Sequence, residues 1–112
     1  MPRDYRIYLN DIIESAGRID DYTEGSSLKQ LSADRMRADA VIRNLMVIGE
    51  AAKNIPAEIR SMAPDVEWEE ISGLRDVLIH QYFGADLEII WGVIRNDLPK
   101  LKKRVGELLK KA

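Results

Sequence analysis

The sequence predicts an all-α fold, a bundle of four to five helices joined by short loops. Apolar residues recur every three or four positions along nearly all of the 112 residues, which is the spacing of one helix face. No stretch alternates apolar and polar residues as a half-buried strand does. The length fits one domain, so we expect a single helical domain over residues 1–112.

Two long helices are predicted in the first half of the chain. The first runs from about Asp4 to Tyr22, and its apolar stripe is Tyr5, Leu9, Ile12, Ala16 and Ile19. The sequence Gly25-Ser26-Ser27 breaks the pattern. Asp34 is a good N-cap for the second helix, whose stripe is Val41, Leu45, Ile48, Ala52 and Ile55. Pro56 ends that helix because it lacks an amide hydrogen and disfavours helical geometry just before it.

The second half predicts one short helical turn over Ala57 to Met62 and two further helices. The third helix begins near Glu67 and ends around residues 82–84, and its inner stripe is Trp68, Ile71, Leu74 and Leu78. Asp86 caps the fourth helix, whose inner stripe is Leu87, Ile90, Trp91 and Ile94. Pro99 is expected to kink or restart this helix before the stripe continues through Leu101, Val105 and Leu108.

The second helix carries more apolar surface than a bundle of this size needs. Beyond its inner stripe, it presents Met36, Ala40, Val47 and Ala51 around its sides. Excess apolar surface on a small chain favours a partner face, and a homodimer is the simplest partner. A wide stripe is also compatible with a role in the core of the single chain.

Composition excludes several classes of protein. There is no cysteine, so disulfides and thiolate metal sites are excluded, and a single histidine leaves only scattered carboxylates as metal ligands. We therefore expect no metal site, and without a glycine-rich phosphate loop we expect no cofactor. No apolar run approaches a membrane span, and the first residues do not form a signal peptide. A cytoplasmic protein is expected.

Charge is distributed unevenly along the chain. The formal net charge is −2, which argues against a general nucleic-acid coat. Residues 95–112 hold seven basic and two acidic side chains, a balance of +5, so the remainder carries −7. This basic segment would attract a phosphate backbone. A solvated lysine face with favourable charge at a helix C-terminus explains the same pattern.

The most informative stretch is residues 75–82, which contain the only histidine of the chain. The His80 imidazole can take and give a proton near neutral pH, and the Arg75 guanidinium can grip a phosphate through two parallel hydrogen bonds. Tyr82 follows two residues later. These groups suit cleavage of a phosphodiester without a metal.

Helical geometry places these groups on different sides of the third helix. Tyr82, seven residues after Arg75, lies on nearly the same line, whereas His80 is about 140° around the helix. His80 instead stacks over Asp76, whose carboxylate would raise the pKa of the imidazole and orient the ring. Arg75 and His80 therefore meet on one phosphate only if the helix distorts before His80 or if two chains share one cleft.

Two residues of the second helix are candidate supports for Arg75. Asn44 falls on the buried stripe and Glu50 lies close to it, and a buried amide or carboxylate needs a partner such as the guanidinium. Purely structural interpretations remain open for the motif itself. A histidine near a helix C-terminus often interacts with the last carbonyl groups, and an arginine beside an apolar stripe often extends along it.

The stretch Arg75-Asp-Val-Leu-Ile-His80-Gln-Tyr82 resembles the Arg-x4-His-x-Tyr signature of bacterial HEPN ribonuclease toxins of the HepT type. Four further segments resemble the layout of that family in the same order. They are residues 41–56, residues 68–74, residues 82–86, and Ile90-Trp91 followed by Asp97-Leu98-Pro99. The likeness covers roughly residues 4 to 110, essentially the whole chain.

The resemblance implies a HEPN-like bundle that forms a homodimer, with the motif lining a cleft between the subunits. It implies a metal-independent endoribonuclease toxin of a type VII (HEPN/MNT) toxin–antitoxin system, with Arg75 and His80 as catalytic residues and RNA rather than DNA as substrate. It also implies a cognate minimal nucleotidyltransferase antitoxin that inactivates the toxin by AMPylation of Tyr82. The alternative is a non-enzymatic helical subunit that docks such a nucleotidyltransferase, and a third interpretation is an inert structural bundle.

Overall fold

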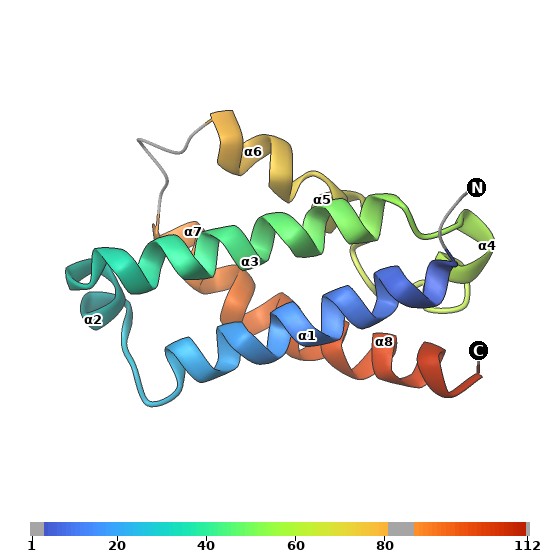
Figure 1. Cartoon of the computed structure of the whole chain (residues 1–112), viewed down its shortest axis with the longest axis horizontal. Coiled ribbons are helices and arrows are strands. Elements are labelled where there is room, and N and C mark those ends of the chain that lie inside the picture. Colours follow the sequence, from blue (N-terminus) through green and yellow to red (C-terminus); the bar gives the residue numbers. More distant parts are fainter. Residues whose placement is uncertain (1–3, 81–86, 112) are drawn as a thin grey trace.

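The computed structural model describes residues 4–80 and 87–111, with the backbone alone at residues 79 and 80. In these two ranges the chain is helical and contains no strand, which confirms the predicted all-α class. Two long helices, α1 (Tyr5–Thr23) and α3 (Arg35–Lys53), lie side by side, and α8 (Leu98–Lys111) packs along α1 (Figure 1). The short helices α5 (Trp68–Ser72) and α6 (Leu74–His80) lie against α3.

Helix α1 begins one residue after the predicted start. The Asp4 carboxylate accepts a hydrogen bond from the Arg6 backbone N–H (2.9 Å) and caps the helix. Hydrogen bonds from the Arg6 side chain and backbone lower the pKa of the Asp4 carboxyl to about 2. The Asp4 carboxylate therefore stays ionised through the ordinary carboxyl range. Its contribution to stability is present above the ordinary carboxyl pKa and is lost as the pH falls towards 2.

The connection between α1 and α3 contains a helix that the apolar pattern of the sequence does not predict. Helix α2 (Leu28–Ala33) follows Gly25, whose φ of 69° is a conformation that favours glycine. Ser27 and Gln30 form a reciprocal capping box at its start. Asp34 then caps α3 as predicted, because its carboxylate accepts from the Arg37 backbone N–H (3.1 Å).

The predicted third helix is in fact two helices. A single turn, α4 (Ala57–Arg60), is followed by α5 (Trp68–Ser72) and α6 (Leu74–His80), which are separated at Gly73. The Gly73 N–H closes α5 by donating to the carbonyls of Glu69 and Ile71. Glycine has low helix propensity, and the break lets the apolar sides of α5 and α6 follow α3 separately.

Gly49 permits the close approach of α3 to this break. A Cβ at position 49 would lie 3.0 Å from both the Arg75 backbone nitrogen and the Ile71 carbonyl oxygen. Real Cβ contacts with backbone atoms are rarely so short, so any side chain here forces α5 and α6 away from α3. The glycine thus sets the distance between α3 and the first residues of α6.

We expect Gly49→Ala to lower the free energy of unfolding by about 1–3 kcal/mol, because an overpacked crossing must displace backbone rather than a side chain. Gly17→Ala in α1 is the matched control, since its Cβ would meet nothing within 4 Å. The control should raise stability by about 0.5–1 kcal/mol through helix propensity. Urea unfolding measures both changes. Equal effects of the two substitutions would contradict a tight crossing at Gly49.

The helical segment that begins at Leu87 is distorted just before Pro99. Helix α7 (Leu87–Gly92) continues into the π-helix η2 (Val93–Asp97) and then into α8. The Leu98 N–H donates to the Val93 carbonyl, five residues back. Pro99 has no N–H and clashes with the carbonyl four residues before it in a regular helix, so a widened turn accommodates it. Pro99 therefore distorts the helix where the sequence predicted a kink or restart. The predicted cap of this helix, Asp86, lies outside the described residues.

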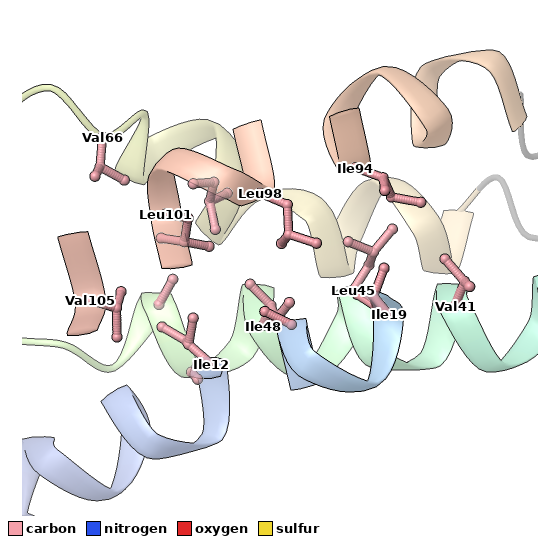
Figure 2. Packing of buried hydrophobic residues seen from close by; sticks show 14 of the residues in the cluster. Ile12, Ile19, Val41, Leu45, Ile48, Val66, Ile94, Leu98, Leu101 and Val105 are labelled. Atoms are coloured by element: carbon pink, nitrogen blue, oxygen red, sulfur yellow. The ribbon is translucent and has the colours of Figure 1, made fainter. Parts of the chain in front are cut away.

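The buried core consists of the predicted stripes. Figure 2 shows residues of α1, α3, α8 and η2 meeting in one cluster. Among the predicted inward residues, all but Tyr5, Leu74, Leu87 and Trp91 are buried, and these four are partly buried against the same cluster. In the described ranges, no helix is both long and apolar enough to cross a membrane.

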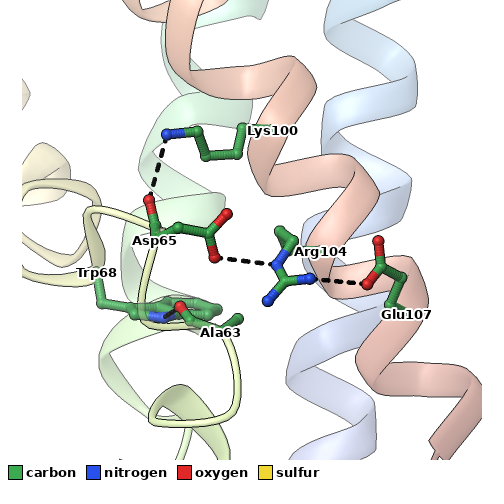
Figure 3. Close-up of polar contacts among 6 residues, drawn as sticks. All are labelled: Ala63, Asp65, Trp68, Lys100, Arg104 and Glu107. Atoms are coloured by element: carbon green, nitrogen blue, oxygen red, sulfur yellow. Dashed lines mark hydrogen bonds and ion pairs between the residues drawn. The ribbon is translucent and has the colours of Figure 1, made fainter.

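Most described contacts of the basic C-terminal segment join it to the rest of the fold. The Arg104 guanidinium donates to the carboxylates of Asp65 (3.0 Å) and Glu107 (2.8 Å), and the Lys100 ammonium donates to the Asp65 carbonyl (3.3 Å) (Figure 3). Beside them, the Trp68 indole N–H donates to the Ala63 carbonyl (2.9 Å). Lys102 pairs with Asp20 of α1. These contacts favour a structural role for much of the positive charge.

Candidate active site

Arg75 lies at the start of α6, where it faces α3. Its Nε atom is 3.5 Å from Oε2 of Glu50, so the two helices are joined by an ion pair beside the Gly49 crossing. Both side chains are about half exposed, 46% for Arg75 and 51% for Glu50. The predicted contact between Arg75 and Glu50 is therefore present, although Glu50 is exposed rather than buried.

The exposure of this pair keeps the guanidinium available to a ligand. Exposed ion pairs contribute little to stability, since water screens them and the side chains lose freedom. The Arg75 Nη1 atom also lies 3.8 Å from Oδ1 of Asp76, which is itself largely exposed. A phosphate that docks here exchanges weak carboxylate contacts for two parallel hydrogen bonds to the guanidinium. Arg75 is thus oriented without being sequestered.

The other motif residues are located less completely. His80 is the last residue of α6, and its side chain lies outside the described residues, as does all of Tyr82. The predicted contact between Asp76 and His80 is therefore also outside them. The backbone of α6 is helical through His80, so it is not distorted between Arg75 and His80. The two residues lie on different sides of this helix, which disfavours their convergence within one chain.

Asn44 does not support Arg75 as predicted. It is buried on α3, and its Nδ2 atom donates to the Ala40 carbonyl of the same helix (2.8 Å). This bond satisfies the buried amide locally, four residues back, a geometry always available to a short polar side chain inside a helix. Asn44 is therefore part of the internal structure of α3. The residue that sequence reasoning missed is Gly49, for which an isolated glycine on a buried helical stripe was the available signal.

One outer face of α3 leads to the arginine. Met36, Ala40, Arg43, Val47 and Glu50 follow one another at spacings of three and four, and all are at least partly exposed. Met36 and Val47 are exposed apolar side chains, as expected for a partner face. Ala51, predicted for the same surface, is instead buried in the core. The apolar surface beside the site is therefore narrower than predicted.

In the described ranges, no three histidine, aspartate or glutamate side chains gather in a group that would hold a metal ion. The described part of the site thus offers a guanidinium, carboxylates and apolar side chains. A helical bundle with an arginine and, five residues on, a histidine on one helix agrees with the HEPN-like domain that the sequence motif resembles. The family model described as Ribonuclease HepT-like matches residues 12–108, and the chain belongs to this family. This membership confirms the predicted class of enzyme, a ribonuclease.

Relatives agree with the family assignment. A protein of Thermococcus cleftensis named as a probable ribonuclease HepT is 38% identical over 98% of this chain and 100% of its own length. A protein of Caldanaerobacter subterraneus named as an RNase is 41% identical over 95% of each chain. A Methanocaldococcus jannaschii protein, whose name pairs a gamma-glutamylcyclotransferase with an RNase, is 40% identical over 97% of this chain, which spans about half of that relative. No solved structure matches the chain significantly.

Proposed function

We propose that the chain is a metal-independent endoribonuclease and the toxin of a toxin–antitoxin pair. Arg75 binds the scissile phosphate and stabilises the negative charge that develops on it, and His80 transfers protons. The observation that carries the proposal is the half-exposed Arg75 guanidinium on α6, the helix that also contains His80. Glu50 of α3 holds this guanidinium, and the chain belongs to the HepT-like ribonuclease family. Asp76 supports the chemistry by orienting the His80 ring from one turn before it.

The proposed reaction needs two proton transfers. One imidazole takes the proton of the ribose 2′-hydroxyl as its oxygen attacks phosphorus. The bond from phosphorus to the 5′-oxygen then breaks, and a second, protonated imidazole gives its proton to that leaving oxygen. The products are a 2′,3′-cyclic phosphate and a free 5′-hydroxyl. Arginine suits the intermediate charge because its fork matches two phosphate oxygens.

A homodimer supplies the second imidazole. Each chain has one histidine, and a two-fold axis through the motif helices would place two histidines and two arginines in one cleft. The exposed Met36 and Val47 on the outer face of α3, which leads to Glu50 and Arg75, support an interface there. The undistorted backbone of α6 supports the same arrangement, because one chain alone separates Arg75 from His80.

Tyr82 is the proposed point of control. A cognate minimal nucleotidyltransferase antitoxin transfers AMP from ATP to the Tyr82 hydroxyl, the bond between the α- and β-phosphates breaks, and pyrophosphate leaves. The added group brings bulk and negative charge to the motif, seven residues after Arg75 in the sequence, where it would compete with the substrate phosphate. Mass spectrometry of the chain coexpressed with a minimal nucleotidyltransferase tests this step by the mass of one AMP on the peptide containing Tyr82.

The activity test uses purified chain and bulk cellular RNA in the presence of EDTA. We expect cleavage fragments that end in a 2′,3′-cyclic phosphate. Induced expression of the chain alone should arrest growth, and His80→Ala should relieve the arrest. A folded dimer that leaves RNA intact at high concentration would contradict the proposal and favour the alternative, a binding subunit for the nucleotidyltransferase.

Glu50 is expected to act as a positioning residue for Arg75. Glu50→Ala removes the contact with Nε, so the guanidinium samples more orientations, and we expect kcat for RNA cleavage to fall about tenfold while KM changes little. Glu50→Gln keeps an oxygen acceptor and should recover most of kcat. Glu14→Ala is the matched control, because Glu14 is also an exposed partner of an arginine, Arg18. Equal rates for Glu50→Ala and Glu14→Ala would contradict this role.

A further inference from the structure

A groove with apolar walls lies on the opposite side of α6 from the Arg75–Glu50 pair. It has a volume of about 210 Å³ and is lined by Glu67 and residues of α5, α6, α7 and η2. The apolar lining residues are Ile71, Leu74, Val77, Ile89 and Val93. Val77 follows Arg75 by two residues, about 200° around the helix, so the groove and the arginine occupy different faces.

The apolar side chains at the mouth of the groove are unusually exposed. Val77 is 48% exposed and Ile89 is 61% exposed, although Ile71 beneath them is buried. Covering aliphatic side chains of this size with a partner removes apolar surface from water and is favourable. An apolar cluster with a buried floor and exposed rims is the usual form of a site for a partner's side chains.

The charged side chains that line the groove are acidic among the residues that the structure describes. They are Glu67, Glu70 and Asp97, and no described lining residue is basic. Three carboxylates at one apolar site repel a phosphate backbone, which separates this surface from the proposed RNA cleft. They attract lysine or arginine side chains placed beside an apolar anchor.

We propose that this groove docks an amphipathic helix of a protein partner, with aliphatic side chains entering between α6 and α7 and lysine or arginine side chains facing Glu67, Glu70 and Asp97. Helix-in-groove binding uses anchors at spacings of three, four and seven residues, which match a narrow apolar slot. The chain's own basic helix α8 does not fit this description, because its apolar stripe is buried in the core. Docking on this face requires neither RNA cleavage nor the dimer.

Binding is tested by fluorescence anisotropy on the full chain with a labelled leucine–lysine peptide of about four helical turns. Two peptides serve as controls, one with glutamate in place of lysine and one with scrambled order that has no apolar face. We expect the amphipathic cationic peptide alone to bind. Equal binding of the scrambled peptide would show general attraction to an acidic protein and would overturn the proposal.

Matched substitutions locate the peptide. Ile89→Ser should weaken binding about tenfold, whereas Ile7→Ser, at a 40% exposed isoleucine of α1, should leave it unchanged. Glu70→Gln should weaken binding about threefold, whereas Glu69→Gln, on the same helix but outside the groove, should not. Full binding by Ile89→Ser and Glu70→Gln would overturn the proposal. The proposal would also be overturned if sedimentation showed that the wild type is a dimer and that Ile89→Ser is a monomer. The occupant of the groove would then be a second copy of the chain.

Discussion

His80→Ala is expected to reduce RNA cleavage by about a hundredfold to ten-thousandfold, the range that general acid–base catalysis contributes. The chain has no other histidine, so no nearby imidazole replaces the lost group. The measurement is the initial rate of cleavage of a labelled RNA in EDTA. The wild-type rate should show a bell-shaped dependence on pH, because one imidazole must be neutral and the other protonated.

Added imidazole separates a chemical role of His80 from a structural one. Free imidazole should restore part of the activity of His80→Ala, since it can enter the space left by the side chain and carry the proton. It should not change the rate of the wild type. Catalysis by His80 would be ruled out if His80→Ala cleaved RNA at the wild-type rate while its urea unfolding midpoint equalled that of the wild type.

Arg75→Ala is expected to reduce kcat for RNA cleavage by about a hundredfold to a thousandfold, comparable with the loss of one donor to a developing oxyanion. Arg75→Lys should fall between this variant and the wild type, because it keeps the charge but loses the planar fork. The rates are measured on the same labelled RNA, with the melting temperature of each variant recorded alongside.

Arg18→Ala is the matched control for Arg75→Ala. Arg18 is an arginine of similar exposure, 53%, that is also paired with a glutamate, but on α1 and away from the motif helix. Arg75→Ala breaks exposed contacts with Glu50 and Asp76, and Arg18→Ala breaks one exposed ion pair. Each substitution should change stability by less than about 1 kcal/mol. Only Arg75→Ala should slow cleavage, so equal rates for the two variants would exclude Arg75 from the chemistry.

The long helices and the core were predictable because spacing alone determines them. The stripes of α1, α3 and α8 are buried as predicted, except for the partly buried Tyr5. Asp34 caps α3 with its side chain, as its residue type and position indicated. Helix α2 was missed even though Ser27 and Gln30 have the spacing of a capping box. Its six residues are too few to show an apolar period.

The remaining differences depend on tertiary contacts. The stripe from Trp68 to Leu78 has continuous helical spacing, so only the packing of α5 and α6 on α3 reveals the break at Gly73. The dependence on tertiary contacts is also the reason why the candidate site could be predicted only in part. Glu50 meets Arg75 across the close crossing at Gly49, whereas the Asn44 amide is satisfied within its own helix. Sequence indicated which polar groups need partners but not which helix supplies them.

The internal pairing of the C-terminal cations has a consequence for how RNA affinity varies with ionic strength. Of the seven basic residues from Arg95 onwards, Arg95, Lys100, Lys102 and Arg104 already contact groups of the protein itself. Each phosphate neutralised on a single strand releases counterions and adds about −0.7 to the slope of log K against log salt. Cations that are already paired within the protein neutralise few phosphates of the RNA, so few counterions are released. The slope of log K against log salt should therefore be shallow for RNA binding. We then expect selection of the substrate to depend on the shape and unstacked bases of the RNA rather than on its charge.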